Sequence, residues 1–161
     1  RILPIYEGTT GIQANDLVGR KILGDEGREM KVLIADMRAT ANSLGQADDL
    51  QDMQPALVAA IDDLETAVNW LIDNAPADPN VAGAAGVNLL MLAGTVLGGW
   101  QMARSALAVT DASSKADAKF RDAKLHTARF YIENILPRST AYMSAATTGS
   151  DSVMALAEEL F

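Results

Sequence analysis

The sequence predicts an all-α fold, an up-and-down antiparallel bundle of helices around one long central helix that is rich in alanine and glycine. Between Val81 and Trp100 the chain carries no charged residue, and a helix that is apolar on every side must be covered by other elements or by lipid. Apolar residues after Pro55 recur at intervals of three and four, which is the seam of a helix packed nearly parallel to its neighbours; they are Leu57, Ile61, Leu64, Val68 and Leu71. No run of alternating or β-branched residues is long enough for a strand.

Composition excludes several classes of site. The chain has 161 residues, of which 49% are hydrophobic, enough for one domain with a substantial core. Its net charge of −8 argues against nucleic acid as a partner, because the surface would repel phosphate backbones. There is no cysteine and only one histidine, His126, so the sequence predicts no disulfide, no thiolate nucleophile and no metal site.

The first half of the chain is expected to form three helices. Thr10 and Gln13 have the spacing of a capping box, so a helix should begin at Thr10 and end at Gly24, placed as a left-handed C-cap. A second helix is expected over residues 26–44, with Gly45 as its stop. Pro55 belongs in the first turn of the third helix, and residues 75–79 should break it.

The central helix is expected over residues 78–109, with Asp78 as its N-cap and Pro79 in its first turn. Each glycine weakens a helix by about 1 kcal/mol relative to alanine, so we expect the glycines here to let neighbouring helices approach closely; they are Gly83, Gly86, Gly94, Gly98 and Gly99. The apolar stretch is long enough to cross a membrane. Its Ala and Gly content, Asn88 and the lack of preceding basic residues favour a core helix instead.

The last part of the chain is expected to be helical as well. Residues 110–114 should close the central helix and cap the next one, whose predicted apolar face holds Phe120, Ala123, Ala128, Tyr131, Ile132 and Ile135. Pro137 should kink or end that helix, with helical structure continuing over residues 138–148. Gly149 and Ser150 should open a final short helix that carries Val153, Met154, Leu156 and Leu160.

The residues most suggestive of chemistry lie near the start of the chain, at Tyr6-Glu7-Gly8-Thr9-Thr10-Gly11. A glutamate on a glycine-flanked turn just before a helix lies where backbone can approach a ligand closely. The first N–H groups of the helix favour an anion such as a phosphate. This pattern is compatible with a base that acts on a phosphate-bearing substrate or cofactor. The alternative from spacing alone is an acidic residue in a capped turn.

Residues 5–13, Ile-Tyr-Glu-Gly-Thr-Thr-Gly-Ile-Gln, with Asp16-Leu17-Val18-Gly19-Arg20-Lys21, closely resemble the last active-site segment of the acyl-CoA dehydrogenases, especially members with an extra C-terminal helical domain. The resemblance implies that Glu7 is the catalytic base and that its main-chain N–H helps bind the thioester carbonyl. It also implies that Gly8 leaves room for the acyl chain and that Thr9, Thr10 and Gly11 lie against the flavin. The medium-chain enzymes have Gln where this chain has Gly11, so a side-chain contact with the cofactor is missing there.

The resemblance also implies the organisation of the protein. Residues 1–24 would end the catalytic domain, and residues 25–161 would form the C-terminal helical bundle. The intact enzyme would bind FAD and an acyl-CoA thioester, pass electrons to an electron-transfer flavoprotein, and form a homodimer or homotetramer. It would act in the bacterial cytoplasm or the mitochondrial matrix and would not be secreted.

The chain starts at Arg1 without a methionine or a signal-peptide pattern, so we expect a piece of a longer protein that is inactive and binds no flavin tightly by itself. The alternative is a non-enzymatic helical module for self-association or for docking on a membrane surface.

Overall fold

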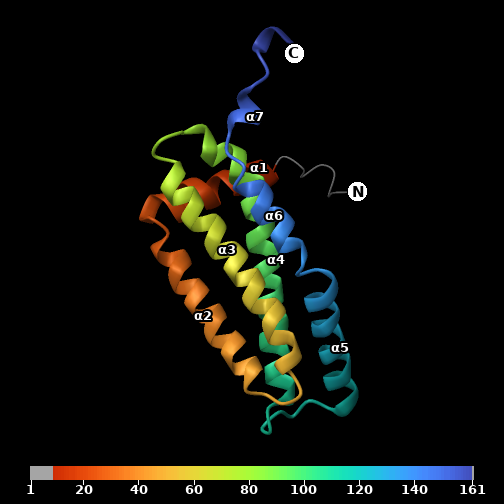
Figure 1. Cartoon of the computed structure of the whole chain (residues 1–161). Coiled ribbons are helices and arrows are strands. Elements are labelled where there is room, and N and C mark those ends of the chain that lie inside the picture. The colour runs from red at the N-terminus through yellow and green to blue at the C-terminus, as the bar shows by residue number, and fades with distance from the viewer. Residues whose placement is uncertain (1–8, 161) are drawn as a thin grey trace.

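A computed structural model describes residues 9–160 and confirms the predicted all-α bundle (Figure 1). The long helices α2 (Arg28–Gly45), α3 (Gln54–Asn74) and α4 (Asn80–Thr110) run side by side in alternating directions. The helices α5 (Ala118–Asn134) and α6 (Arg138–Ala146) follow one another back along α4. Residues 9–160 contain no strand.

Shorter elements complete the chain. Before the bundle lie α1 (Thr9–Asn15), a π-helical segment η2 (Asp16–Ile22) and a 3₁₀ turn η3 (Leu23–Asp25). A second 3₁₀ turn, η4 (Gln51–Met53), leads into α3, where Pro55 lies in the first turn as predicted. At the end lie α7 (Asp151–Met154) and a last 3₁₀ turn, η5 (Glu158–Leu160).

Helix α4 is the centre of the fold. It contacts α1, α2, α3, α5 and α6, and most of its buried apolar residues belong to one continuous hydrophobic core. The predicted seam of α3 is confirmed, because all five of its residues, Leu57, Ile61, Leu64, Val68 and Leu71, are at most 1% exposed. Helix α4 is also long and apolar enough to span a membrane by length and composition, and 44% of its most apolar 18-residue window is buried inside the bundle.

The glycines of α4 divide into two groups, which corrects the prediction that all of them allow close packing. A Cβ added to Gly99 would lie 2.7 Å from Leu136, and one added to Gly98 would lie 2.6 Å from Cζ of Tyr131. At Gly86 the added Cβ would be 3.5 Å from Ala14, an ordinary van der Waals contact. Gly83 and Gly94 face open space with no heavy atom within 4 Å. Only part of α4 is therefore covered by neighbouring helices.

The predicted helix ends need three corrections. Thr10 lies inside α1, which is assigned from Thr9, so Thr10 is not its N-cap. Gly24 lies within η3, and the left-handed residues that end this segment are Glu26 and Gly27 instead. Helix α5 is capped by Asp117, whose carboxylate accepts a hydrogen bond from the N–H of Phe120 at 2.9 Å, and not by residues 110–114.

Asp78 caps α4 as predicted, although the helix begins two residues later, at Asn80. Its Oδ1 accepts a hydrogen bond from the N–H of Asn80 at 3.0 Å, and its Oδ2 accepts one from the hydroxyl of Ser150. The Ser150 hydroxyl, followed by the Asn80 N–H, lowers the pKa of Asp78 below its usual range, because both bonds stabilise the charged carboxylate. The contact joins the start of α4 to Ser150, which lies between α6 and α7.

Polar contacts fix how the helices sit against one another. Arg38 on α2 pairs with Asp62 and Glu65 on α3, at 2.7 Å for Asp62. The Trp100 indole on α4 donates to the Thr40 hydroxyl on α2 at 2.7 Å. Ser139 and Thr140 on α6 both donate to Oδ2 of Asp63 on α3, at 2.7 Å and 2.9 Å. These bonds link three helix pairs of the bundle in a defined register.

The two glycine environments on α4 predict opposite effects of one substitution. Gly94→Ala should raise the free energy of unfolding by about 0.5 to 1 kcal/mol, because an exposed helical glycine loses more backbone entropy than alanine. Gly98→Ala should lower it by about 1 to 3 kcal/mol, because the new methyl group displaces the Tyr131 ring. That ring also donates through its hydroxyl to the Thr95 carbonyl at 3.1 Å.

Urea unfolding of both variants and the parent chain, followed by circular dichroism, measures the two effects. Equal effects at both positions would contradict the assigned packing of α4 against α5.

Candidate functional site

The sequence-predicted site residues fall at the start of the described chain. Glu7 and Gly8 lie outside the described residues. Thr9, Thr10 and Gly11 form the first turns of α1, where Thr9 and Gly11 are exposed and Thr10 is half-buried. A Cβ added to Gly11 would meet no heavy atom within 4 Å. The structure therefore keeps the three predicted cofactor residues together on one open turn.

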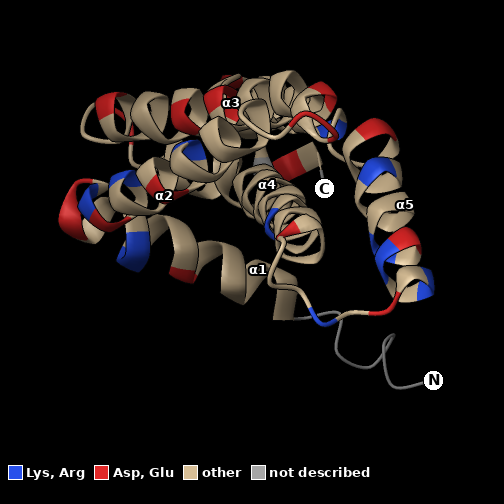
Figure 2. Ribbon diagram, turned by 90° about the horizontal axis from the view of Figure 1, so that it is seen from below, with Lys and Arg blue, Asp and Glu red and all other residues tan. Residues whose placement is uncertain are grey.

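Helix α1 is attached directly to the central helix. Ala14 is 2% exposed, and it packs against the position of Gly86 on α4. Val18 and Ile22 in η2 are buried in the common core. Figure 2 shows α1 and the turns after it on the side of α4 that lies opposite α3. The exposed turn at Thr9 is thus carried by a segment that is anchored to the bundle at three buried side chains.

The π-helical segment η2 was not predicted. Its widened turn spans Asp16–Ile22 and includes Gly19, and an ion pair joins Arg20 to Asp16 at 2.5 Å. The hydrogen bond from Arg20 lowers the pKa of Asp16. π-helical turns are rare and occur frequently at functional sites. The apolar spacing of Leu17, Val18 and Ile22 is compatible with an ordinary helix, so the sequence contains no signal that distinguishes the two.

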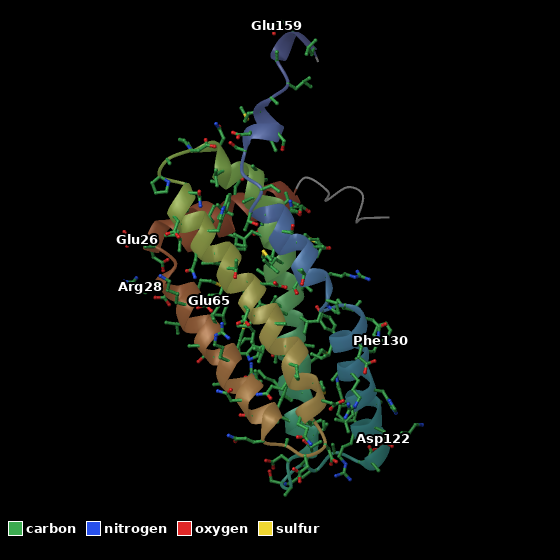
Figure 3. The ribbon with its side chains drawn as sticks, in the orientation of Figure 1. Glu26, Arg28, Glu65, Asp122, Phe130 and Glu159 are labelled. Carbon is green, nitrogen blue, oxygen red and sulfur yellow. The ribbon has the colours of Figure 1, made fainter. Side chains whose placement is uncertain are left out.

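A left-handed turn separates this first segment from α2. Glu26 has φ 56° and Gly27 has φ 73°, and Glu26 is the one non-glycine residue with positive φ among the described residues. A Cβ on Gly27 would lie 2.6 Å from Cδ1 of Ile72, so glycine is required there on both conformational and steric grounds. Figure 3 shows Glu26 and Arg28 at the outer end of α2. The turn lies just after the predicted domain boundary between residues 24 and 25, which stays a prediction.

A groove of about 530 Å³ lies between η2, α2 and α4. Its apolar lining comes from Leu17, Met30, Leu33, Ala93 and Leu97. Its charged lining residues are Arg20 and Lys21 of η2, Asp25 of η3 and Glu29 of α2. Oδ2 of Asp25 accepts a hydrogen bond from the N–H of Glu29 at 3.1 Å, whereas Oδ1 of Asp25 is buried without a hydrogen-bond partner, and Glu29 pairs with Arg28 at 3.5 Å. Periodicity in the sequence could not find this groove, because its lining comes from three separate elements.

Other chemically suggestive side chains have structural roles. Among the described residues, no group of three or more His, Asp or Glu side chains could hold a metal ion. Arg129 pairs with Asp52 and donates to the Asp49 carbonyl at 2.6 Å, so it ties α5 to the loop before α3. The Lys124 ammonium lies 5.7 Å from the centre of the Phe120 ring. His126 is exposed, as expected for a surface histidine.

Comparison with known proteins identifies a family. The family model described as acetyl-CoA dehydrogenase C-terminal like matches residues 33–157. This match begins within α2, after the π-helical segment, and extends past α7.

Individual relatives match nearly all of the chain. A 3-methylmercaptopropionyl-CoA dehydrogenase of Ruegeria pomeroyi is 39% identical over 96% of this chain and 26% of its own length. A butyryl-CoA dehydrogenase of Syntrophomonas wolfei is 30% identical over 100% of this chain and 27% of its own length. A broad-specificity linear acyl-CoA dehydrogenase of Mycobacterium tuberculosis is 29% identical over 100% of the chain and 28% of its own length. The chain thus spans about a quarter of the length of the relatives it matches.

The left-handed turn predicts a stabilising substitution. A left-handed conformation costs a non-glycine residue roughly 1 to 2 kcal/mol, whereas glycine loses about 0.5 to 1 kcal/mol of extra backbone entropy on folding. Glu26→Gly should therefore raise the free energy of unfolding by up to about 1 kcal/mol. Glu26→Gln keeps the strain and should change stability little. Thermal melts of both variants test this, and a destabilised Glu26→Gly chain would contradict the assigned turn.

Proposed function

This chain belongs to the family described as acetyl-CoA dehydrogenase C-terminal like, and on that premise we propose that it is the C-terminal part of an FAD-dependent acyl-CoA dehydrogenase. The observation that carries the proposal is that two dehydrogenases match the whole chain, from the motif at residues 5–13 to the end of the bundle. The segment that carries the motif and the bundle thus both fall within the match to proteins named for this activity.

The proposed reaction is the α,β-dehydrogenation of an acyl-CoA thioester. The α-carbon loses a proton to a base, the β-carbon loses a hydride to FAD, and a carbon–carbon double bond forms between them. A base for this step needs a pKa raised by exclusion of water, and a carboxylate enclosed by acyl chain and cofactor meets that need.

The resemblance assigns these roles to residues 7–11 of this chain. In the proposal Glu7 takes the α-proton, and its main-chain N–H helps to bind the thioester carbonyl. Gly8 leaves space for the acyl chain. The substrate class is a CoA thioester, because the three relatives are dehydrogenases named for 3-methylmercaptopropionyl-CoA, butyryl-CoA and linear acyl-CoA.

The described residues fit one wall of a flavin site. The first turn of α1 is exposed at Thr9 and half-buried at Thr10, and a Cβ added at Gly11 would meet no heavy atom within 4 Å, which leaves room for a planar cofactor. When bound, FAD accepts the hydride equivalent from the β-carbon. Thr9, Thr10 and Gly11 would hold the cofactor there, and the burial of Ala14 against α4 would keep them in place. We propose an electron-transfer flavoprotein as the next electron acceptor and a homodimer or homotetramer as the assembly.

The bundle has a separate part in this proposal. It anchors the motif-bearing segment through α1 and η2, so a shift of α4 would move the exposed turn at Thr9. The alternative, a non-enzymatic module for self-association or docking, would leave the motif without a role. It would be favoured if the residues preceding this chain in its protein formed an unrelated domain.

The chain of 161 residues should be catalytically silent by itself. In the proposal the described residues supply only one wall of the flavin site, and a dinucleotide cofactor needs further elements to cover it. The purified chain should be colourless, with no flavin absorbance after incubation with FAD and gel filtration. A yellow chain that reduces its flavin when acyl-CoA is added would contradict the division of the site between this chain and the rest of the enzyme.

The role of Glu7 is tested in the longer protein that contains this chain. Glu7→Gln keeps size and shape and removes the basic oxygen, so FAD content and thioester binding should persist. Turnover should fall by about 10²- to 10⁴-fold, the usual contribution of a general base, or by more if no other group takes the proton. The measurement is bleaching of the flavin absorbance after anaerobic mixing with acyl-CoA.

Glu26→Gln is the matched control for Glu7→Gln. Glu26 is an exposed glutamate beyond the buried anchor residues of η2, and its replacement should leave bleaching unchanged. α-Proton exchange in heavy water, followed for both variants, separates loss of the base from loss of hydride transfer. If the flavin of the Glu7→Gln enzyme bleached near the parent rate, Glu7 would not be the catalytic base, and the motif would be only a capped turn.

A further inference from the structure

One side of the central helix is left open by the rest of the bundle. We define the open stripe as Gly83, Val87, Met91 and Gly94, whose spacing of four, four and three places them on one side of α4. A Cβ added to Gly83 or Gly94 would meet no heavy atom within 4 Å. Val87 is 47% exposed and Met91 is 43% exposed. The stripe is therefore an apolar surface that the described helices do not cover.

Exposed apolar side chains gather at the end of the bundle that carries this stripe. Among the described residues, ten large apolar side chains are exposed, and seven of them belong to α1, the first half of α4 or residues 151–160. They are Ile12, Val87, Met91, Val153, Met154, Leu156 and Leu160. Figure 1 shows α1, the start of α4 and α7 at the same end of the bundle. Exposed apolar groups concentrated in this way mark an interaction surface.

The elements at this end carry no charge over long stretches. Residues 9–15, 80–103 and 139–150 contain no Asp, Glu, Lys or Arg. They form α1, most of α4, and most of α6 with the loop that follows it. Depletion of charged residues is typical of the core of an interface between two protein surfaces. A segment that binds an anionic membrane would instead carry lysine or arginine beside its apolar face, so the composition favours a protein surface as the occupant.

The polypeptide enters the bundle beside the open stripe. Ala14 on α1 packs against Gly86, the residue directly before Val87. Thr9 lies five residues before Ala14 in α1, so whatever precedes Thr9 is attached within about 8 Å of this contact along the helix. Residues 151–160 leave the bundle nearby, because the hydroxyl of Ser150 donates to Asp78 just before α4 begins.

Most of a protein of this family lies outside the present chain. The chain spans about a quarter of the length of its relatives, and the matching family model describes a C-terminal region. A covalent tether would hold the preceding part next to the stripe at a millimolar effective concentration, an advantage that a free partner does not have.

We propose that the open stripe, together with Ile12 and the apolar side chains of residues 151–160, is covered by the part of the same polypeptide that precedes this chain. The covering surface is apolar, and it approaches the α4 backbone closely at Gly83 and Gly94, where no side chain intervenes. The inference rests on the family of the chain and not on the dehydrogenation reaction. A protein inactivated by Glu7→Gln should therefore have the same covered stripe.

Cysteine labelling tests the cover, because the present chain contains no cysteine. Val87→Cys and Met91→Cys each place one thiol on the stripe, and in the 161-residue chain both should react readily with iodoacetamide. In the longer protein that contains this chain, the same thiols should react at least about tenfold more slowly, because the cover excludes the reagent. Mass spectrometry of the peptide that carries each new cysteine measures the rates.

Val32→Cys on α2 and Phe130→Cys on α5 are the matched controls. Val32 is 56% exposed and Phe130 is 59% exposed, and both lie outside the proposed surface. Their thiols should react at rates within about twofold of each other in the 161-residue chain and in the longer protein. Circular dichroism of all four variants should match that of the parent, since none of the four replaced side chains belongs to the core.

Photo-cross-linking identifies what lies on the stripe. In the longer protein, the photoreactive residue p-benzoylphenylalanine replaces Met91. Irradiation should give a product that keeps the mass of one polypeptide on a denaturing gel, and the cross-linked peptide should map to residues that precede this chain.

Three results would overturn the proposal. The first is labelling of Val87→Cys and Met91→Cys at equal rates in the 161-residue chain and the longer protein. The second is equally strong protection of the two control thiols, because the cover would then not be specific to the stripe. The third is a cross-linked product with the mass of two polypeptides, which would assign the stripe to a second copy, or one confined to this chain.

Discussion

The structure depends on the burial of one uncharged helix. Between Val81 and Trp100 helix α4 carries no charge, and it can exist in this chain because α1, α2, α3, α5 and α6 all contact it. The small residues of α4 determine how closely these helices approach it. Where Tyr131 and Leu136 press against Gly98 and Gly99, a single added carbon atom would collide with them. Helix α4, the most apolar of the described helices, therefore also determines the positions of its neighbours.

The position of the candidate site depends on helix α4. The motif identified by resemblance ends in α1, and α1 is joined to α4 at Ala14 and Gly86. The exposed turn at Thr9 and the buried core are separated by less than two helical turns. In an enzyme of the proposed kind, substitutions that repack α4 would alter catalysis through the geometry of Thr9, Thr10 and Gly11, without any contact with substrate.

The sequence predicted features that follow from local period and composition. The seam of α3, the turn at Pro55 and the break at Pro137 depend on short-range patterns, and the structure confirms each of them. The sequence could not show which side of α4 is covered by other helices. Gly94 and Gly98 are the same residue type and differ only in what packs against them. The π-helical turn and the left-handed Glu26 depend on the packing of η2 onto the bundle, which local propensity does not encode. Within the site, the residues were identified by resemblance, whereas the groove beside them arises only from tertiary structure.

The break at Pro137 has a consequence for cooperativity. Helix α5 buries Ala128 and Ile132 only in its second half, and its first turns are exposed, whereas the buried Leu136 and Ser139 hold the start of α6. Proline has no N–H, so Pro137 donates no main-chain bond, and around it the spacing changes to i→i−5 at Leu136 and to i→i−3 at Arg138 and Ser139. We therefore expect fraying that begins in α5 to stop before α6. Amide hydrogen exchange would divide this rod into a fast-exchanging unit and a slow one, with local opening of α5 that leaves the core intact.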